Sequence, residues 1–397
     1  MIIRSAIILI LVLASSWTGI RSAETSKVYD SAKNTIINDV ALYPFFKQLD
    51  SLLKLKNGKV NVVHIGDSHI QADYFSGQVR RRLQSMFGNG GRGFVFPYQI
   101  ANSNSPNDIK VQHQGEWMSN SIMKGYEFAE IGASGYVVKA KDSAEFLLYL
   151  SNKGKSTNSF NKLTVFQTGG QFIPVNEHLE PLAVALGGSN HLPYASYLLS
   201  EYHDSIRMIA RASGNQDVQL HGLSFENTQP GLVYHSMGTN GSSTLHYLRS
   251  TEFSKHIASL KADLVIVSFG TNDCYLPYSR FCSSCATDRF RTIIWKIKKE
   301  SPNATILLTT PADHYYRRRY DNRNLWYLRK SLKRLAEEEG VALWDLYDIM
   351  GGERSIVEWR DNALARRDLI HFTKDGYQLQ GNLLFQAIMD SYEGRFN

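Results

Sequence analysis

Apolar and polar residues alternate in two different ways along the chain. Before residue 99 and after residue 229, short apolar runs adjoin longer stretches whose apolar residues recur every three or four positions. This alternation predicts strands that are each followed by an amphipathic helix. The expected strands are Val60–Ile65, Leu232–His235, Asp263–Phe269, Thr305–Thr309 and Val341–Asp345.

The expected helices lie before, between and after these strands. Strands that are apolar throughout and alternate with helices are typical of a parallel sheet covered on both faces. We therefore predict an α/β fold with a doubly wound, mostly parallel sheet of five strands. The expected helices span about residues 41–55, 74–87, 245–257, 287–299, 322–339 and 373–388, the last with Thr373 as its N-cap.

Between residues 99 and 229 the pattern changes. Short runs rich in β-branched and aromatic residues are separated by Asn, Ser and Gly, without long helical patterns. This predicts an all-β, sandwich-like module. Because the α/β alternation resumes after it, we expect an insertion into a discontinuous domain of residues 24–98 and 230–397. The expected strands of the module are Tyr136–Lys139, Phe146–Leu150, Leu163–Gln167, Leu182–Leu186, Ser205–Ile209 and Val218–Phe225.

The first 23 residues resemble a targeting segment. Arg4 precedes the apolar run Ala6–Ala14, which is followed by small residues, and this order predicts a signal peptide cleaved after Ser16 or Ala23. An uncleaved N-terminal anchor is the alternative, although the run is shorter than the roughly 20 residues that span a bilayer. We expect an exported protein, periplasmic or secreted, without a transmembrane segment once the signal is removed.

Composition and charge favour an ordinary globular protein. The chain has 397 residues, of which 43% are hydrophobic and 20% charged, and its Lys and Arg exceed its Asp and Glu by 44 − 37 = 7. Basic residues cluster only at Arg80–Arg82 and Arg317–Arg319, in or beside helical patterns, so we expect solvated helix faces there. No nucleic-acid-binding module is recognisable, and we expect no nucleic-acid partner.

The cysteines lie close together in the sequence. Cys274, Cys282 and Cys285 allow one local disulfide in an oxidising compartment and leave one thiol free, with the pairing open. A structural zinc site needs four ligands, and no histidine or fourth cysteine has the usual spacing. We expect neither a metal nor another cofactor.

Polar residues that suit acyl transfer follow the expected strands. Ser68 follows the first strand, Gly241 the second and Asn272 the third, whereas Asp368 and His371 precede the last helix. Ligands of open parallel sheets bind outside the carboxyl ends of the strands. These loops should therefore converge on one crevice, although they are far apart in the sequence.

Each of these residues has a place in ester hydrolysis. The Ser68 hydroxyl needs a base such as His371 to remove its proton, and Asp368 can orient that base and stabilise its charged form. The oxyanion of the tetrahedral intermediate needs fixed donors, which the N–H groups of Ser68 and Gly241 and the Asn272 amide can supply. We therefore predict a Ser-His-Asp hydrolase site.

The four motifs, in this order, resemble those of the SGNH (GDSL-type) hydrolases. The resemblance covers roughly residues 60–98 and 230–392, and it implies a flavodoxin-like core. The motifs are GDSH at 66–69, a glycine loop that ends at Gly241, GTND at 270–273 and DxxH at 368–371.

The resemblance assigns Ser68 as nucleophile, Asp368 and His371 as the rest of the triad, and Gly241 and Asn272 as oxyanion donors. The chain departs from the pattern in two places. His69 stands where a leucine is often found, and it either contacts substrate or packs under the loop. The glycine loop matches the family motif only loosely, so Gly238 is an alternative to Gly241 as the oxyanion donor.

Three other polar residues of these motifs have a structural interpretation. We expect Asp67 to cap the helix or brace its loop and Asp273 to be a partner within its own turn. His64 lies in a buried strand pattern, where a histidine with satisfied hydrogen bonds is the expectation.

A narrower resemblance suggests a substrate. The stretches GDSHIQAD and GNGGRGFVFP, the β insertion and the signal peptide are together similar to those of bacterial peptidoglycan O-acetylesterases. This resemblance implies an exported serine esterase that removes O-acetyl groups from a glycan through an acyl-enzyme, with a carbohydrate-binding insertion. The alternatives are a polysaccharide O-acetyltransferase, another carbohydrate acetylesterase, a lipase or thioesterase, and a glycan-binding protein without activity.

Overall fold

The computed structural model describes most of the chain after the expected signal peptide. Residues 1–23, to which that signal was assigned, lie outside the described part. The structure describes residues 28–395, apart from 125–129, 152–157, 176–180, 188–191 and 215.

A six-stranded sheet forms the centre of the α/β core. Its order is β1-β19-β16-β15-β2-β14, and all neighbours are parallel except β1, which pairs antiparallel with β19. The prediction of five strands was therefore one short, because β1 has only two residues and leaves no periodic pattern. The strands are β1 (Ile36–Ile37), β2 (Lys59–Gly66), β14 (Gly231–Gly238), β15 (Leu264–Ser268), β16 (Thr305–Thr309) and β19 (Ala342–Trp344).

Helices cover both faces of this sheet. Val62 and Val63 of β2 belong to two different hydrophobic clusters, because successive strand residues point to opposite faces. The Val62 cluster includes α3 (Tyr43–Leu55), α5 (Phe75–Phe87) and α13 (Lys374–Gly394). The Val63 cluster includes α7 (Phe253–Ser259), α9 (Ser283–Glu300) and α10 (Asn324–Glu339).

The remaining helices are short, and several follow the carboxyl ends of strands. The α-helices among them are α4 (Ser68–Gln71), α6 (Thr244–Tyr247), α8 (Thr271–Cys274), α11 (Leu346–Ile349) and α12 (Ser355–Asp361). The 3₁₀ turns are η1 (Ser31–Lys33), η2 (Asp39–Leu42) and η3 (Tyr278–Arg280).

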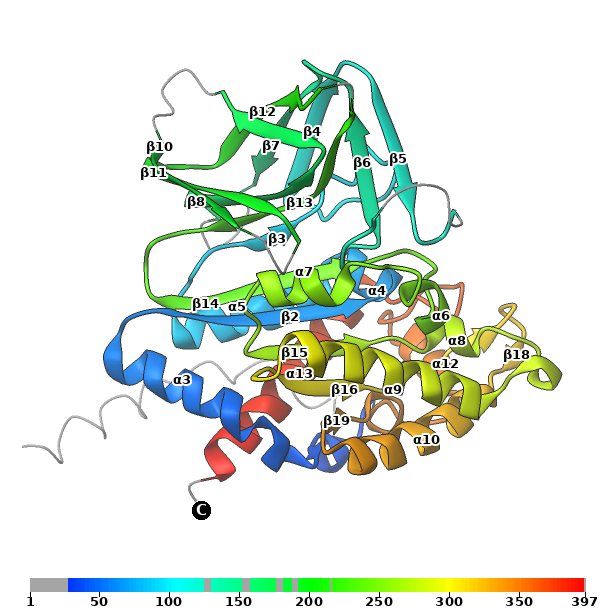
Figure 1. Ribbon diagram of the computed structural model, residues 1–397. Helices are drawn as coiled ribbons and strands as arrows, with labels where there is room; N and C mark the ends of the chain where they lie inside the picture. The colour runs from blue at the N-terminus through cyan, green and yellow to red at the C-terminus, as the bar shows by residue number, and fades with distance from the viewer. Residues whose placement is uncertain are drawn as a thin grey trace, which may run out of the picture.

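Two antiparallel sheets make up the inserted region, drawn above the core in Figure 1. One has the order β10-β11-β8-β13-β6-β5, with β3 also paired to β13, and the other has the order β4-β7-β12-β9. The strands are β3 (Gly93–Val95), β4 (Ile109–Gln114), β5 (Trp117–Ser121), β6 (Tyr136–Ala140), β7 (Glu145–Leu150), β8 (Phe160–Thr168), β9 (Gly170–Pro174), β10 (Pro181–Gly187), β11 (Tyr194–His203), β12 (Ser205–Ala212) and β13 (Val218–Glu226).

The six expected strands of this region correspond to six of these. Strands β4, β5, β9 and β11 were not predicted, since polar residues interrupt their apolar pattern. Strand β3 lies before the expected boundary at residue 99 yet pairs with β13. Both sheets join the hydrophobic cluster that also covers one face of the core sheet. The sandwich arrangement and the domain boundaries remain predictions.

The expectation of solvated helix faces holds for Arg81 and Arg82, which are exposed on α5, but not for the other arginines of the two clusters. Arg80 is buried in α5, where its guanidinium forms two hydrogen bonds with the Asp73 carboxylate at 3.0 and 2.8 Å. Arg317–Arg319 form the turn between β17 (Tyr315–Tyr316) and β18 (Tyr320–Asp321). Arg317 and Arg318 have φ angles of 53° and 59°, which fit a tight hairpin turn rather than a helix.

The cysteines are resolved as one disulfide, between Cys282 and Cys285, and a buried free thiol at Cys274. In the described part of the chain, we find no helix with the length and apolar character needed to cross a membrane.

Candidate active site

A sharp turn after β2 places Ser68 at the carboxyl end of the sheet. The Asp67 carboxylate caps α4 by accepting a hydrogen bond from the N–H of His69 at 3.0 Å, and Ser68 is the first residue of that helix. A Cβ on Gly66 would lie 2.6 Å from the carbonyl oxygen of Ser268, so only glycine permits this close approach to β15.

Ser68, His371 and Asp368 form a chain of hydrogen-bonding groups. The Oγ of Ser68 lies 3.1 Å from Nε2 of His371, and Nδ1 of His371 lies 2.8 Å from Oδ2 of Asp368. The structure therefore brings together two segments separated by 303 residues. A nucleophile, a base and a group that orients the base are in contact in the order that acyl transfer requires.

The loop before α13 holds the acid and the base in one turn. Leu369, between them, has a φ of 55°, and the Asp368 Oδ1 accepts hydrogen bonds from the N–H groups of Ile370 and His371 at 3.0 and 2.9 Å. Burial alone would raise the pKa of Asp368, but the backbone and ring N–H groups of His371 outweigh it and lower this pKa. The carboxylate is therefore charged at neutral pH.

The predicted oxyanion donors face the same cleft as Ser68. Gly241 and Asn272 both line it, whereas Gly238 is packed against α4, where a Cβ would lie 2.2 Å from the N of Gln71. The Asn272 amide donates to the carbonyl of Ser242 at 2.9 Å. The geometry thus favours Gly241 over Gly238 as the glycine at the cleft, and the role of each donor remains a proposal.

The cleft has a volume of about 500 Å³ and takes residues from both regions of the chain. Several residues that line the cleft were not predicted, because they belong to no recognisable motif. Tyr74 and Tyr377 lie near the starts of α5 and α13, and proximity to GDSH and DxxH was the available signal. The lining residues that were not predicted are Ala72, Tyr74, Asn104, Asn240, Thr271, Tyr275, Arg366, Ile370 and Tyr377.

His69 packs beside His371 and is not among the residues that line the cleft. Its Nδ1 contacts the Tyr377 hydroxyl at 2.9 Å, and its ring centroid lies 5.4 Å from that of His371. Burial, and next the neighbouring His371, keep the pKa of His69 well below its usual value. His69 was expected either to contact substrate or to pack under the loop. The structure places it under the loop, and a contact with substrate stays a prediction.

The other polar residues of the motifs brace the loops. The pKa of Asp67 is raised to about 7 by burial, while Asp273 accepts from the N–H of Thr244 at 3.0 Å and pairs with Arg289 at 3.4 Å. His64 is fully buried, with its ring nitrogens 2.7 Å from the hydroxyls of Tyr234 and Ser268. Asp67 and His64 lie as the structural interpretation expected, whereas Asp273 contacts two other segments rather than its own turn.

Gln71 joins the inserted region to the glycine loop. Its amide Nε2 donates to the hydroxyl of Ser103 at 2.9 Å and to the carbonyl of Asn104 at 2.7 Å. Its Oε1 accepts a hydrogen bond from the N–H of Asn240 at 2.7 Å. One buried side chain therefore positions two walls of the cleft, Asn104 and the loop that contains Gly241.

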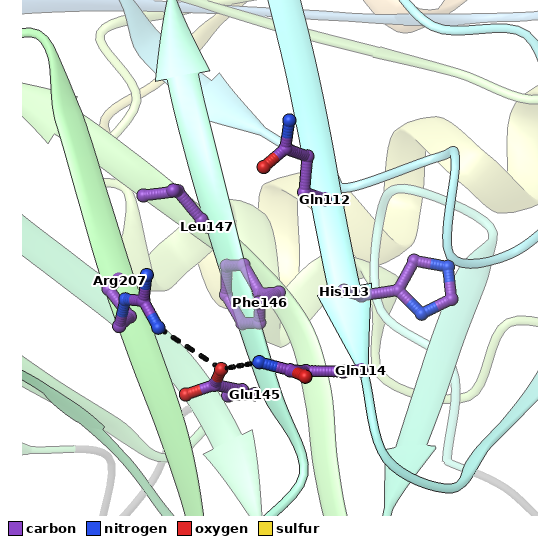
Figure 2. A pocket seen from close by; sticks show the side chains of 7 residues that line it. All are labelled: Gln112, His113, Gln114, Glu145, Phe146, Leu147 and Arg207. Carbon is purple, nitrogen blue, oxygen red and sulfur yellow. Dashed lines mark hydrogen bonds and ion pairs between the residues drawn. The ribbon is translucent and has the colours of Figure 1, made fainter.

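A second hollow, of about 250 Å³, lies on the four-stranded sheet of the inserted region and is shown in Figure 2. Arg207 and Gln114 converge there on the Glu145 carboxylate. Its lining holds no serine, threonine or cysteine nucleophile, so it lacks the chemistry of the first cleft. Among the residues that the structure describes, no group of three His, Cys, Asp or Glu side chains is placed to hold a metal ion.

Comparison with known families shows what the chain is similar to. The model of the GDSL-like lipase/acylhydrolase family matches residues 207–379. Over this part the chain is similar to the GDSL-like hydrolases. Its reaction class is carboxylic ester hydrolysis. The matched region contains Gly241, Asn272, Asp368 and His371 but begins after Ser68, so the long insertion separates the first motif from the others. No curated protein matches the chain.

One solved structure extends the likeness to the inserted region. A structure described as a peptidoglycan O-acetylesterase is 20% identical, with a TM-score of 0.68 over 88% of this chain and 96% of its own. At that identity the likeness concerns the fold. A lipase/acylhydrolase from Enterococcus faecalis (22% identity, TM-score 0.33) and an acetyl xylan esterase (20%, 0.33) cover 40% and 39% of the chain, and 76% and 81% of their own.

Proposed function

We propose that this protein is an exported serine esterase that removes O-acetyl groups from peptidoglycan. The contact chain from Ser68 through His371 to Asp368, open to the cleft, carries this proposal. The fold shared with a peptidoglycan O-acetylesterase, including the inserted region, supports the choice of substrate. The expected signal peptide supports a periplasmic or secreted location.

The reaction starts with the removal of a proton from Ser68 Oγ by His371 Nε2, while the oxygen attacks the acetyl carbonyl carbon. The negative charge on the carbonyl oxygen is stabilised by the N–H groups of Ser68 and Gly241 and by the Asn272 amide. His371 then gives its proton to the departing sugar oxygen, which leaves an acetyl-serine.

A water molecule completes the cycle. It loses a proton to His371 and attacks the acetyl-serine, and the Ser68 oxygen recovers the proton as acetate leaves. Throughout, Asp368 keeps its negative charge and stabilises the imidazolium of His371 through the 2.8 Å contact.

The test compares wild type with Ser68→Ala on p-nitrophenyl acetate, O-acetylated peptidoglycan and acetylated xylan, following acetate release. We expect the wild type to be active on peptidoglycan, and the variant to lose turnover by about 10⁴-fold or more with an unchanged circular dichroism spectrum. Undiminished turnover in the variant would exclude the serine mechanism. Acetyl groups that pass to a chitooligosaccharide instead of appearing as acetate would indicate an O-acetyltransferase.

The inserted region is proposed to bind carbohydrate, as the family resemblance implies. Its hollow presents the polar side chains of Gln112, Gln114, Glu145 and Arg207 in one place (Figure 2), which suits sugar hydroxyls. Co-sedimentation with insoluble peptidoglycan tests this proposal, with Gln112→Ala/Gln114→Ala expected to leave more protein in the supernatant than wild type. Equal sedimentation of the variant and wild type would show that this hollow is not the carbohydrate-binding site.

A further inference from the structure

The hairpin β17–β18 extends one wall of the cleft with aromatic and basic residues. Tyr275 lines the cleft, and its hydroxyl accepts a hydrogen bond from the backbone N–H of Arg317 at 3.1 Å. The ring of Tyr316 lies 5.2 Å from that of Tyr275, and the Arg317 guanidinium carbon lies 5.2 Å from the centre of the Tyr316 ring. A continuous run of contacts therefore leads from the cleft wall to the arginines of the turn.

The arginines of this turn differ from others in the protein. Arg80, Arg92 and Arg329 each form close ion pairs with aspartates, whereas Arg317–Arg319 are exposed and form no ion pair within the described residues. The nearby Asp321 carboxylate lies 3.8 Å from Arg354. Three cations held by a short turn are therefore available to a ligand.

The loop before α13 adds a further positive charge at the cleft. Arg366 lines the cleft, and its Nε donates to the carbonyl of Phe372 at 3.2 Å, which fixes the side chain at the rim. Asp368 is the carboxylate closest to Arg366 in the sequence, and it is paired with His371. A polymer that lies in the cleft and over the hairpin would therefore meet the positive charge of Arg366 as well as the charges of the turn.

We propose that Tyr275, Tyr316 and Arg317–Arg319 form a subsite for carboxylate groups of the glycan next to the acetyl ester. This inference rests on the proposed function and narrows its substrate to an anionic glycan. Arginine suits carboxylates because its planar fork donates two hydrogen bonds to them. Peptidoglycan carries carboxylates on its stem peptides, whereas the xylose backbone of acetylated xylan is neutral.

The experiment measures kcat/KM for acetate release by wild type and by Arg317→Gln/Arg318→Gln/Arg319→Gln. On O-acetylated peptidoglycan at low ionic strength, we expect the variant to lose about five- to tenfold, through KM, because exposed ion pairs are individually weak. Added salt should reduce the wild-type rate toward that of the variant, since it screens exposed charges. On acetylated xylan the ratio of the two proteins should stay within about twofold.

Two further proteins keep the result interpretable. Arg317→Lys/Arg318→Lys/Arg319→Lys retains the charge and should recover most of the lost activity. Lys47→Gln/Lys54→Gln/Lys56→Gln removes three charges at and just after α3, at the opposite end of the molecule from β18 (Figure 1), and should behave as wild type. Equal losses on both polymers, or an equal loss in the α3 variant, would overturn the subsite.

Removal of stem peptides with an amidase identifies the source of the carboxylate. If the peptides are the ligand, the advantage of wild type over the glutamine variant disappears on the treated polymer. If it persists, the lactyl carboxylate that the amidase frees on the glycan strand is sufficient for recognition. Should wild type fail to release acetate from any polymer while Ser68-dependent hydrolysis of p-nitrophenyl acetate persists, the proposed substrate is wrong, and with it the subsite.

Discussion

The α/β core and the inserted region bury different kinds of polar residue. In the core, carboxylates and guanidiniums are buried behind the ends of the strands. They are Asp67, Asp73, Arg80, Arg92, Asp273, Asp313 and Asp345. In the described residues from 99 to 229, the buried polar side chains carry no charge near neutral pH. They are Ser121, Ser134, Asn161, Thr164, Gln167, His221, Ser224 and Asn227.

His221 follows this rule, because burial lowers its pKa to about 4 and keeps it neutral. A buried charge is costly unless it is paired or hydrogen-bonded. The core accepts that cost where loops must be held at the sheet edge, as the Asp73 carboxylate shows by accepting from both Arg80 and Arg92 at 2.8 Å. In the inserted region, Asp108 is partly exposed and pairs with the buried Arg92 of the core at 2.6 Å. The comparison suggests that chemistry and pH dependence belong to the core.

The largest expected effect comes from the charged triad member. Asp368→Asn keeps the shape of the side chain but removes the charge that stabilises the imidazolium of His371. We expect kcat for p-nitrophenyl acetate to fall about 10³- to 10⁴-fold. Arg367→Gln, an exposed neighbour in the same loop, is the matched control and should retain full activity. A loss of kcat below tenfold in Asp368→Asn would show that the charge of Asp368 is not needed for catalysis.

Loss of a neutral hydrogen-bond donor, the Asn272 amide, should lower kcat less than loss of the Asp368 charge. Asn272→Ala deletes the amide that faces the cleft, and we expect kcat to fall about 100-fold with KM little changed, because the oxyanion exists only after attack. Asn303→Ala, on an exposed loop, is the control. A change confined to KM would instead assign Asn272 to substrate binding.

The pH dependence of stability should come from a buried core carboxyl. Burial raises the pKa of Asp313 to about 7, so its favourable neutral form is fully present below the unfolded pKa and is lost as the pH rises through 7. From pH 5 to 8, the free energy of unfolding of wild type should fall by about 2 kcal/mol relative to Asp313→Asn. Urea titrations at several pH values measure this difference.

A carboxyl of the inserted region provides the contrast. Asp142 is exposed, and its pKa is lowered because it accepts hydrogen bonds from the N–H of Ala212 and the hydroxyl of Ser143. It is therefore charged throughout the range from pH 5 to 8. The Asp142→Asn variant should follow the wild-type profile, and a pH-dependent deviation as large as that of Asp313→Asn would contradict the division between the two regions.

The smallest effect should come from the contact between the two regions. Gln71→Ala removes the bridge between Asn104 and Asn240, which leaves the glycine loop less fixed. We expect kcat to fall about tenfold, as misplacement of one oxyanion donor requires, without a change in the pH profile. Gln386→Ala, exposed on α13, is the control. An unaffected kcat would show that the inserted region does not position the catalytic loop.

Much of the core could be predicted because its signals are local. The expected strand Thr305–Thr309 coincides with β16, and Thr373 caps α13 by accepting from the N–H of Gly376 at 3.2 Å. The predicted site residues Ser68, Asn272 and His371 line one cleft, as expected from loops that meet at one edge of a parallel sheet, and their catalytic roles stay predictions. The inserted region was less predictable, because strands such as β4 face solvent with most of their residues and lack a continuous apolar run.

Local sequence patterns were enough to predict the strand-turn-helix at Ser68, the order of the four motifs and the alternation that defines the core. These follow from side-chain periodicity, turn residues and strand-end chemistry, which act over a few neighbours. Only the tertiary structure decided that His69 packs beside His371, that Gln71 joins two loops and that Tyr275 meets the hairpin of Arg317. Each of these depends on contacts between segments far apart in the chain, which no local pattern encodes.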